Sequence, residues 1–146
     1  MKKLLLSLLS LGLIYSPQSL ATNCTIEHIS PSPEVRKTFA EFAKVEDIKG
    51  YERLCQQLQR NNAMLCLNGH KNNLKNNTAY AWASASVGDR KTGLCSTASG
   101  GSSTVVFGKN YSEQILQQEL YQTILVAIEG IQLRPALKSL NHRRNQ

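Results

Sequence analysis

The chain has 146 residues, of which 41% are hydrophobic and 18% charged, and its formal net charge is +7. This length suits one domain, which can bury roughly two-thirds of the surface that its unfolded chain exposes. The positive charge is modest and dispersed, without interleaved aromatic and basic residues, so it does not predict a nucleic-acid-binding surface. Beyond the N-terminal segment, no apolar run reaches the roughly 20 residues that span a membrane.

Residues 1–21 match the three-part pattern of a secretory signal peptide. Lys2-Lys3 supplies the positive start, Leu4–Tyr15 is the apolar run, and Ser19-Leu20-Ala21 places small residues where signal peptidase cleaves. The apolar run is too short to cross a bilayer as a helix, which takes about 20 residues. Cleavage after residue 21 leaves 125 residues, removes two lysines and lowers the net charge to +5. We therefore expect a periplasmic or secreted bacterial protein, with no lipid anchor at Cys24.

The four cysteines, Cys24, Cys55, Cys66 and Cys95, are an even number in a chain with an export pattern. In an oxidising compartment this predicts two disulfides, and the sequence leaves three pairings open. We favour Cys55–Cys66, which closes a short helix-to-strand loop, with Cys24–Cys95, which ties the N-terminal segment to the sheet. Cys24 and His28 have the spacing of one metal-ligand pair, but no second pair exists. We therefore predict no metal site and no cofactor.

Two helices are predicted after an irregular lead-in over residues 22–32. The first spans Pro33 to about Ile48, because Ser32 is a good N-cap, proline suits the first helical position and apolar residues recur at helical spacing. The second follows Gly50 and spans Tyr51 to about Arg60. Its apolar residues recur at i, i+3, i+4 and i+7: Tyr51, Leu54, Cys55 and Leu58.

Strands are predicted next. Ala63–Leu67 is short and apolar, Asn68-Gly69 is a strong turn dipeptide, and residues 72–77 form an asparagine-rich loop. Thr78–Val87 alternates between large or polar side chains on one face and alanines on the other. The first face carries Tyr80, Trp82 and Ser84, and the second carries Ala79, Ala81, Ala83 and Ala85.

A hairpin is predicted around the polar loop over residues 88–93, which has a glycine at each end. Leu94–Ala98 returns as its second strand. Ser99–Ser103 is a flexible connection, and Thr104–Phe107 forms a last strand or an extended approach to the next helix.

The longest helix is predicted from about Tyr111 or Ser112 to Leu133. Its apolar stripe consists of Leu116, Leu120, Ile124, Ala127, Ile128 and Ile131. Pro135 stops or kinks it, and residues 135–146 form a polar, basic, frayed tail. The order of elements predicts a single α+β domain over residues 22–134, with two N-terminal helices, a small antiparallel sheet of three or four strands, and the long C-terminal helix packed on the sheet.

Candidate functional residues are few. The chain lacks a Gly-Lys-Ser/Thr phosphate loop and a Gly-x-Ser-x-Gly nucleophile motif, and helix solubility explains most of its acidic residues, so we predict no catalytic residue. The candidate binding residues belong to the hairpin and its loop: Tyr80, Trp82, Asp89, Arg90 and Lys91. For Trp82 the simpler interpretation is a core residue beneath the last helix.

These observations predict an exported, non-enzymatic binding protein of the bacterial envelope: an inhibitor, an immunity protein against a toxin, or an accessory component of an envelope apparatus. We expect the partner to be an envelope or secreted protein. Anionic lipid and cell-wall polymers are the other possible partners, and nucleic acid is not expected. The alternative functions are a small periplasmic hydrolase and a secreted effector or toxin that acts on membrane or cell wall.

Overall fold

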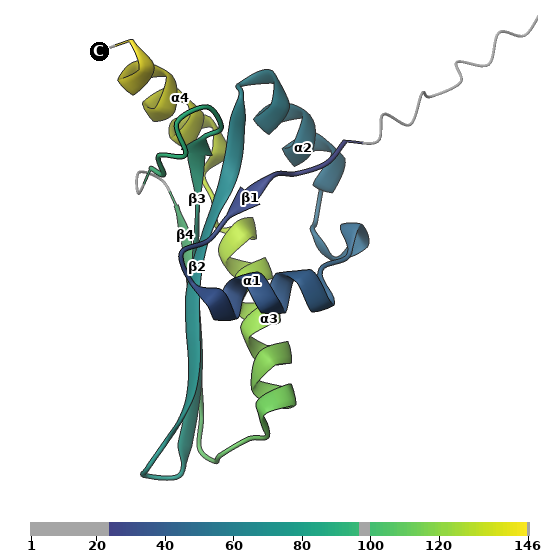
Figure 1. The fold of residues 1–146 in the computed structure, drawn as a ribbon, viewed down its shortest axis with the longest axis vertical. Helices are drawn as coiled ribbons and strands as arrows, with labels where there is room; N and C mark the ends of the chain where they lie inside the picture. The colour runs from purple at the N-terminus through teal and green to yellow at the C-terminus, as the bar shows by residue number, and fades with distance from the viewer. Residues whose placement is uncertain (1–23, 97–99, 146) are drawn as a thin grey trace, which may run out of the picture.

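The computed structural model describes residues 24–96 and 100–145, and it has a mixed α+β fold (Figure 1). The predicted signal peptide lies outside the described residues. The elements follow in chain order: β1 His28–Ile29, α1 Pro33–Phe42, a 3-10 turn η1 Val45–Asp47, α2 Tyr51–Arg60, β2 Ala63–Leu74, β3 Thr78–Asp89, β4 Gly101–Phe107, α3 Glu113–Glu129 and α4 Leu133–Arg144. The predicted class is confirmed, and so are the bounds of the second helix.

The sheet has the order β1-β2-β3-β4. Its three long strands are antiparallel, as predicted, whereas β1 is a two-residue strand that runs parallel to β2. The β2–β3 hairpin is in register from Ala63 opposite Asp89 to Leu74 opposite Thr78. Figure 1 shows this hairpin extending well beyond β1, and near its far end Asn73 exchanges hydrogen bonds with the backbone of Tyr111, in the connection from β4 to α3.

The predicted turn at Asn68-Gly69 is wrong, because both residues lie inside β2. Gly69 is required by close packing instead of by turning: a Cβ there would lie 2.6 Å from the Trp82 carbonyl oxygen and 3.3 Å from Leu120 Cδ1 of α3. The chain turns after Leu74, where Asn77 adopts a left-handed φ of 59°. Asparagine tolerates that conformation better than most residues, so the polar loop supplies the turn.

The hairpin predicted around residues 88–93 is present but short, and the long antiparallel partner on that edge of β3 is β4. The turn exists, but Leu94–Ser96 adds only one bridge, between Cys95 and Gly88. Two backbone hydrogen bonds accompany this bridge, from the Asp89 N–H to the Leu94 carbonyl and from the Ser96 N–H to the Val87 carbonyl, and β4 pairs with the same edge of β3 farther along, from Ala79 to Ala85. The rest of the predicted return strand, residues 97 and 98, lies outside the described part of the chain. Strand β4 begins at Gly101, three residues before the predicted strand.

The first helix ends at Phe42, six residues before its predicted end, because a tertiary contact bends the chain there. Tyr121 of α3 stacks on Phe42, accepts a hydrogen bond from the Lys44 backbone N–H at 3.3 Å, and donates one to Asp47 at 2.8 Å. Burial, reinforced by the Asp47 carboxylate, raises the pKa of Tyr121 to about 12, so the hydroxyl keeps its proton. The bend therefore depends on a residue 77 positions away.

The core lies between α3 and one face of the sheet. The four alanines of β3 are at most 1% exposed, and α3 packs across them with its predicted stripe buried from Leu116 to Ile128. Helix α1 contacts α3 and β2 beside this layer (Figure 1). Alanine and glycine at the contact let α3 approach the sheet closely. The space between α3 and these residues is therefore filled, and added side-chain atoms would not fit.

The predicted long helix is two helices, and the expected frayed tail is helical. Helix α3 ends at Glu129, and α4 begins at Leu133, which places Pro135 in its first turn, where a proline costs no backbone hydrogen bond. Ala136, Leu137 and Leu140 of α4 are buried in the core. These apolar residues have helical spacing, and their burial explains why a segment rich in polar residues is ordered.

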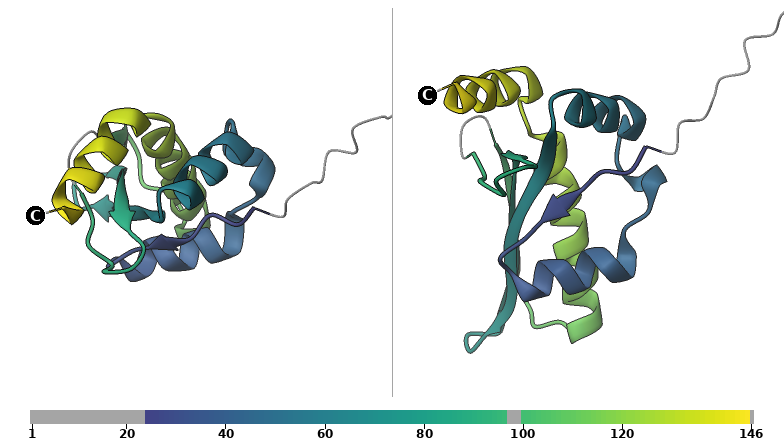
Figure 2. Two further views of the ribbon diagram at one scale, coloured as in Figure 1. Left: turned by 90° about the horizontal axis from the view of Figure 1, so that it is seen from above. Right: turned by 45° about the horizontal axis from the view of Figure 1, so that its top comes forward.

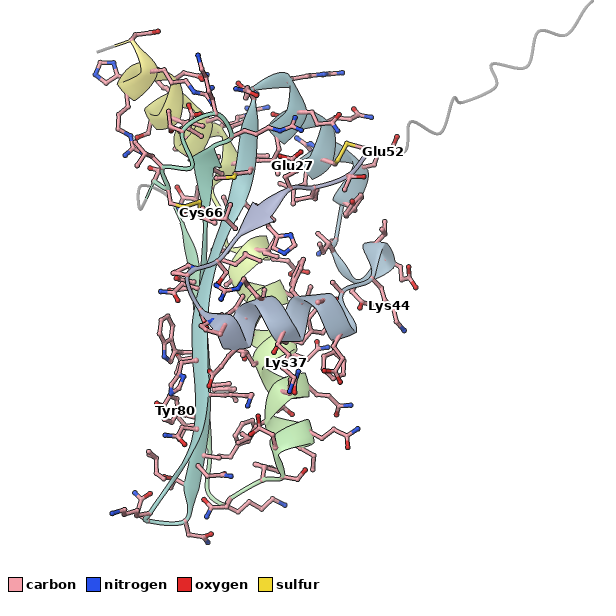
Figure 3. The ribbon with its side chains drawn as sticks, in the orientation of Figure 1. Glu27, Lys37, Lys44, Glu52, Cys66 and Tyr80 are labelled. Atoms are coloured by element: carbon pink, nitrogen blue, oxygen red, sulfur yellow. A yellow bond between two sulfur atoms is a disulfide. The ribbon has the colours of Figure 1, made fainter. Side chains whose placement is uncertain are left out.

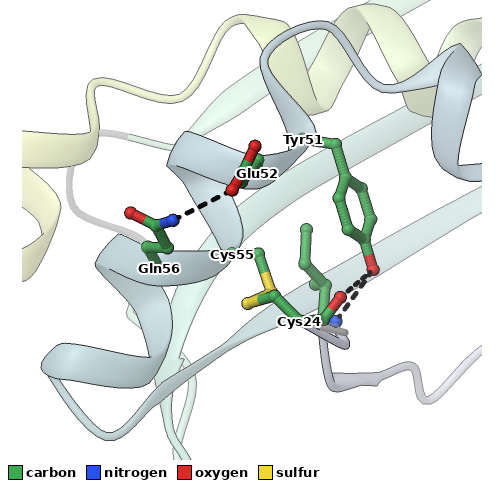
Figure 4. The surroundings of a disulfide bond; sticks show 6 residues. Cys24, Tyr51, Glu52, Cys55 and Gln56 are labelled. Carbon is green, nitrogen blue, oxygen red and sulfur yellow. Dashed lines mark hydrogen bonds between the residues drawn. A yellow bond between two sulfur atoms is a disulfide. The ribbon is translucent and has the colours of Figure 1, made fainter. Parts of the chain in front are cut away.

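All four cysteines form disulfides, but the favoured pairing is wrong: the bonds are Cys24–Cys55 and Cys66–Cys95. Cys66 alternates with the buried Leu65 and Leu67 of β2, so its sulfur points to the opposite face, toward the turn after β3. Cys55 lies on α2 beside the N-terminal lead-in (Figure 4). There Tyr51 donates to the Cys24 carbonyl at 3.0 Å and accepts from the Ile26 backbone N–H at 3.2 Å.

Non-reduced proteolysis with mass spectrometry should recover peptides that join Cys24 to Cys55 and Cys66 to Cys95. Each bond closes a loop of about 30 residues, so replacing either pair by serine should lower the free energy of unfolding by about 2–4 kcal/mol. Recovery of a Cys55–Cys66 peptide from folded protein would contradict the structure.

Gly101→Ala should lower the free energy of unfolding by about 1–3 kcal/mol, because the added Cβ would overlap the Ala127 carbonyl oxygen of α3 and approach the Gly130 carbonyl carbon to 2.8 Å. Urea denaturation measures this change. Gly108→Ala is the matched control, since a Cβ there meets no atom within 4 Å and stability should be retained. Equal stability of the two variants would show that α3 does not approach β4 closely.

Candidate functional site

The face of the sheet opposite α3 is the candidate functional surface, and we call it the outer face. Residues of β3 alternate between buried alanines and half-exposed side chains, so Tyr80 and Trp82 lie on this face, as predicted. The interpretation of Trp82 as a core residue beneath the last helix is wrong. Figure 3 shows Tyr80 pointing away from α1 and α3.

Rows of paired residues across the three long strands build the outer face. Trp82 lies between His70 of β2 and Thr104 of β4, and Tyr80 lies between Asn72 and Val106. The rings of His70 and Tyr80 have centroids 6.0 Å apart, which joins the two rows diagonally. Val106 is 68% exposed. The arrangement is a rigid ladder with aromatic side chains in the middle strand and smaller ones beside them.

The outer face carries no formally charged side chain along β2, β3 and β4. Its residues are Met64, Cys66, Asn68, His70, Asn72, Leu74, Thr78, Tyr80, Trp82, Ser84, Ser86, Gly88, Ser102, Thr104 and Val106. Met64, Cys66 and Gly88 are buried, and the others are half-exposed or exposed. The whole chain has 17 lysines and arginines and 10 acidic residues, so the charged groups are concentrated elsewhere. The solvent-facing side chains of a sheet are ordinarily polar and charged, so a sheet surface without charged side chains is unusual.

A carboxylate–imidazole pair that no sequence pattern predicted borders the outer face. The Nδ1 atom of His70 lies 2.7 Å from a carboxylate oxygen of Glu34, in the first turn of α1. The same oxygen accepts the Lys71 backbone N–H at 3.3 Å. Such a pair fixes the orientation of an imidazole ring and is compatible with proton transfer. Its two members are 36 residues apart in the chain, and only the fold brings them together.

Asp89 holds the turn after β3. Its carboxylate accepts backbone hydrogen bonds from Lys91 at 2.7 Å and Thr92 at 3.0 Å, and it forms an ion pair with Arg144 at the end of α4. Arg144 also donates to the carbonyl groups of Asn61 and Asn62. The Arg144 guanidinium, followed by the backbone donors, lowers the pKa of Asp89 below its usual value of 3.8. The sequence offered no signal for Arg144, since it lay in the expected tail.

The structure separates the five predicted binding residues into two groups. At about 3.3 Å per residue, the seven steps along β3 from Trp82 to Asp89 cover roughly 23 Å. Arg90 forms an ion pair with Glu27 of the lead-in, and Lys91 is exposed in the turn. Tyr80 and Trp82 belong to one continuous surface, whereas Asp89 and Arg90 connect the turn to α4 and to the lead-in.

A shallow apolar hollow of about 240 Å³ lies elsewhere, between β1, α1, η1 and α2. His28 lines it and has its ring centroid 4.5 Å from that of Phe39, while Arg36 and Lys44 also contribute to its wall. Burial lowers the pKa of His28, which favours its neutral form. The hollow therefore suits a small apolar group, but it contains no set of polar groups aimed at one point.

Comparison of the chain with protein-family models, with curated proteins and with solved structures finds no match. Within residues 24–96 and 100–145, no cluster of three or more histidine, cysteine or acidic side chains is arranged to hold a metal ion. Among the helices of that same part of the chain, none has the length and apolar character needed to cross a membrane.

The link between Asp89 and Arg144 should make stability depend on acid pH. The pKa of Asp89 is lower in the folded chain than in the unfolded chain. The contribution of its carboxylate to the free energy of unfolding is therefore complete above about pH 4 and disappears as pH falls through the folded-state pKa. Asp89→Asn should lower the melting temperature at pH 7 and reduce the further loss between pH 5 and pH 3. Glu129→Gln, at an exposed carboxylate with no described ion pair, is the control. An unchanged acid profile in Asp89→Asn would contradict this role.

Proposed function

We propose that the protein is an exported, non-enzymatic binding protein of the bacterial envelope and that a partner protein contacts its outer face around Tyr80 and Trp82. The observation that supports this proposal is the charge-free, aromatic composition of a solvent-facing sheet surface. The signal-peptide pattern over residues 1–21 supports export, and two disulfides are consistent with an oxidising compartment.

The outer face shares two features of composition with the centres of protein interfaces. The centre of an interface is depleted in charged residues and enriched in aromatic ones, and truncation of a central tryptophan or tyrosine often costs more binding energy than any other substitution. Trp82 and Tyr80 are held by strand pairing on both sides, so little conformational entropy would be lost when they are covered. A pre-ordered aromatic surface of this kind favours a protein partner.

The composition also ranks the possible partners. Anionic lipid and cell-wall polymers are attracted by clusters of lysine and arginine, which the three long strands do not present on this side. An inhibitor, an immunity protein and an accessory component of an envelope apparatus all act through protein contacts. These three roles therefore remain the candidates for the outer face.

A small envelope hydrolase is the second candidate, and the His70–Glu34 pair is the observation that favours it. Its imidazole could act as a general base whose orientation is fixed by the carboxylate. Glu34→Gln separates the two candidates, because it would remove the negative charge beside the His70 imidazole and slow a hydrolytic reaction while leaving the aromatic contact surface in place.

Affinity capture of the tagged, oxidised mature chain from its own envelope extract should return one stoichiometric protein, which mass spectrometry identifies. In titrations with that purified protein, Trp82→Ala should weaken binding by about 2 kcal/mol, or roughly 30-fold, because truncation removes a central aromatic anchor. Tyr80→Ala should weaken it in the same direction.

The control for this titration is Val126→Ala, which shortens an exposed apolar residue of α3 away from the outer face. Its affinity should equal that of the unmodified chain. If folded Trp82→Ala and Tyr80→Ala variants bind the partner with full affinity, the outer face is not the contact surface. If the capture experiment returns no protein in stoichiometric amount, the proposed binding function is wrong.

A further inference from the structure

A second surface, formed by helices, has the character of a binding groove. It lies between α2 and the connection from α3 to α4, and its volume is about 290 Å³. Figure 2 shows α2 and α4 at the same end of the molecule, near the C-terminal end of α3. Four aliphatic side chains line the groove and are continuous with the core: Leu54, Ile128, Ile131 and Leu133.

Three cationic side chains surround this apolar floor. Lys49 comes just before α2, Arg53 lies in the first turn of α2, and Arg134 lies in the first turn of α4. All three side chains are exposed and line the groove. None forms an ion pair with any carboxylate of the described residues, and Glu129 is the one carboxylate among the lining residues. By contrast, Arg144 pairs with Asp89 and has a structural role.

Unpaired cations around an apolar floor define the ligand that would complement them. Coulomb attraction favours negative groups at the rim, and removal of the floor from water favours an apolar group between them. A flat bilayer surface cannot reach the floor of a concave groove, whereas one side chain that projects from a polypeptide can. Grooves between helices are a common docking mode for short segments with this pattern.

We infer that this groove binds an acidic segment of a partner protein, with an aliphatic side chain on Leu54 and Ile131 and flanking carboxylates beside Lys49, Arg53 and Arg134. The groove shares no residue with the outer face, so this inference stands independently of the function proposed above. It gives the protein two contact surfaces of different chemistry: one aromatic and uncharged, the other cationic around an apolar floor.

The test uses a fluorescein-labelled peptide in which one leucine is flanked on each side by two glutamates, and it measures fluorescence anisotropy with the full mature chain. Reversal of all three cations in Lys49→Glu/Arg53→Glu/Arg134→Glu should weaken binding roughly tenfold or more, equivalent to about 1.4 kcal/mol. Because the contacts are partly exposed, affinity should also fall as salt is raised.

The matched control is Lys75→Glu/Lys109→Glu/Lys138→Glu, which makes the same change in net charge at exposed lysines outside the groove. This control should bind the peptide with the affinity of the unmodified chain. If both triple variants lose affinity equally, net charge alone explains the weaker binding and the proposal is overturned. Ile131→Gln provides a second variant, in which the rim is intact and the floor is polar; unchanged affinity in it would contradict insertion of the leucine.

Two further arms identify the occupant. Phosphatidylglycerol vesicles should bind the unmodified chain and the triple charge-reversal variant equally well. Stronger vesicle binding by the unmodified chain would show that the groove binds lipid and would overturn the proposal of a protein segment. Trp82→Ala should bind the peptide with full affinity. A failure of the outer face to bind a partner would therefore leave the groove proposal standing, and the reverse also holds.

Discussion

The close approach of α3 to the alanine face of β3 is the constraint on which the rest of the structure depends. Four alanines on β3, together with Gly69 on β2 and Gly101 on β4, remove side-chain volume from the contact layer. The helix can then bury its own leucines and isoleucines against the sheet, and this apolar area stabilises the fold. A residue larger than alanine at any of these four alanine positions would have to displace the helix.

This packing separates the two sides of β3 by size as well as by polarity. The small side chains face α3, so the large ones, Tyr80 and Trp82, occupy the other side of the strand, because strand geometry alternates them. The core of many small domains contains the tryptophan; here the core is filled mainly by aliphatic residues, with Phe39 and Tyr121 from the helices, and Trp82 remains at the solvent boundary. The outer face is therefore a direct result of how the inner face is packed.

Local patterns predicted the features that depend on local periodicity. The bounds of α2, the alternation along β3 and the buried stripe of α3 could all be predicted, because each follows from the repeat of one element. The end of α1 could not, since Tyr121 fixes it, and neither could the straight passage of β2 through Asn68-Gly69, which follows from contact with α3. Tertiary contacts outweighed local turn preferences at these places.

The candidate site shows the same division. The shared orientation of Tyr80 and Trp82 was predictable from alternation, but which side of the strand is buried depends on the volume of the opposing helix. The His70–Glu34 pair and the Asp89–Arg144 pair join residues 36 and 55 positions apart. No spacing rule connects such residues, so only the fold could reveal them.

The two disulfides are arranged one after the other along the chain: the first loop closes at Cys55, before the second begins at Cys66. For a chain that is exported with its N-terminus first, each cysteine pairs with the next one to emerge. In such a chain, oxidation in order of emergence would produce the native connectivity directly, without reshuffling by an isomerase. Helices α3 and α4 follow the last cysteine, so the chain would already be cross-linked when they arrive to complete the core.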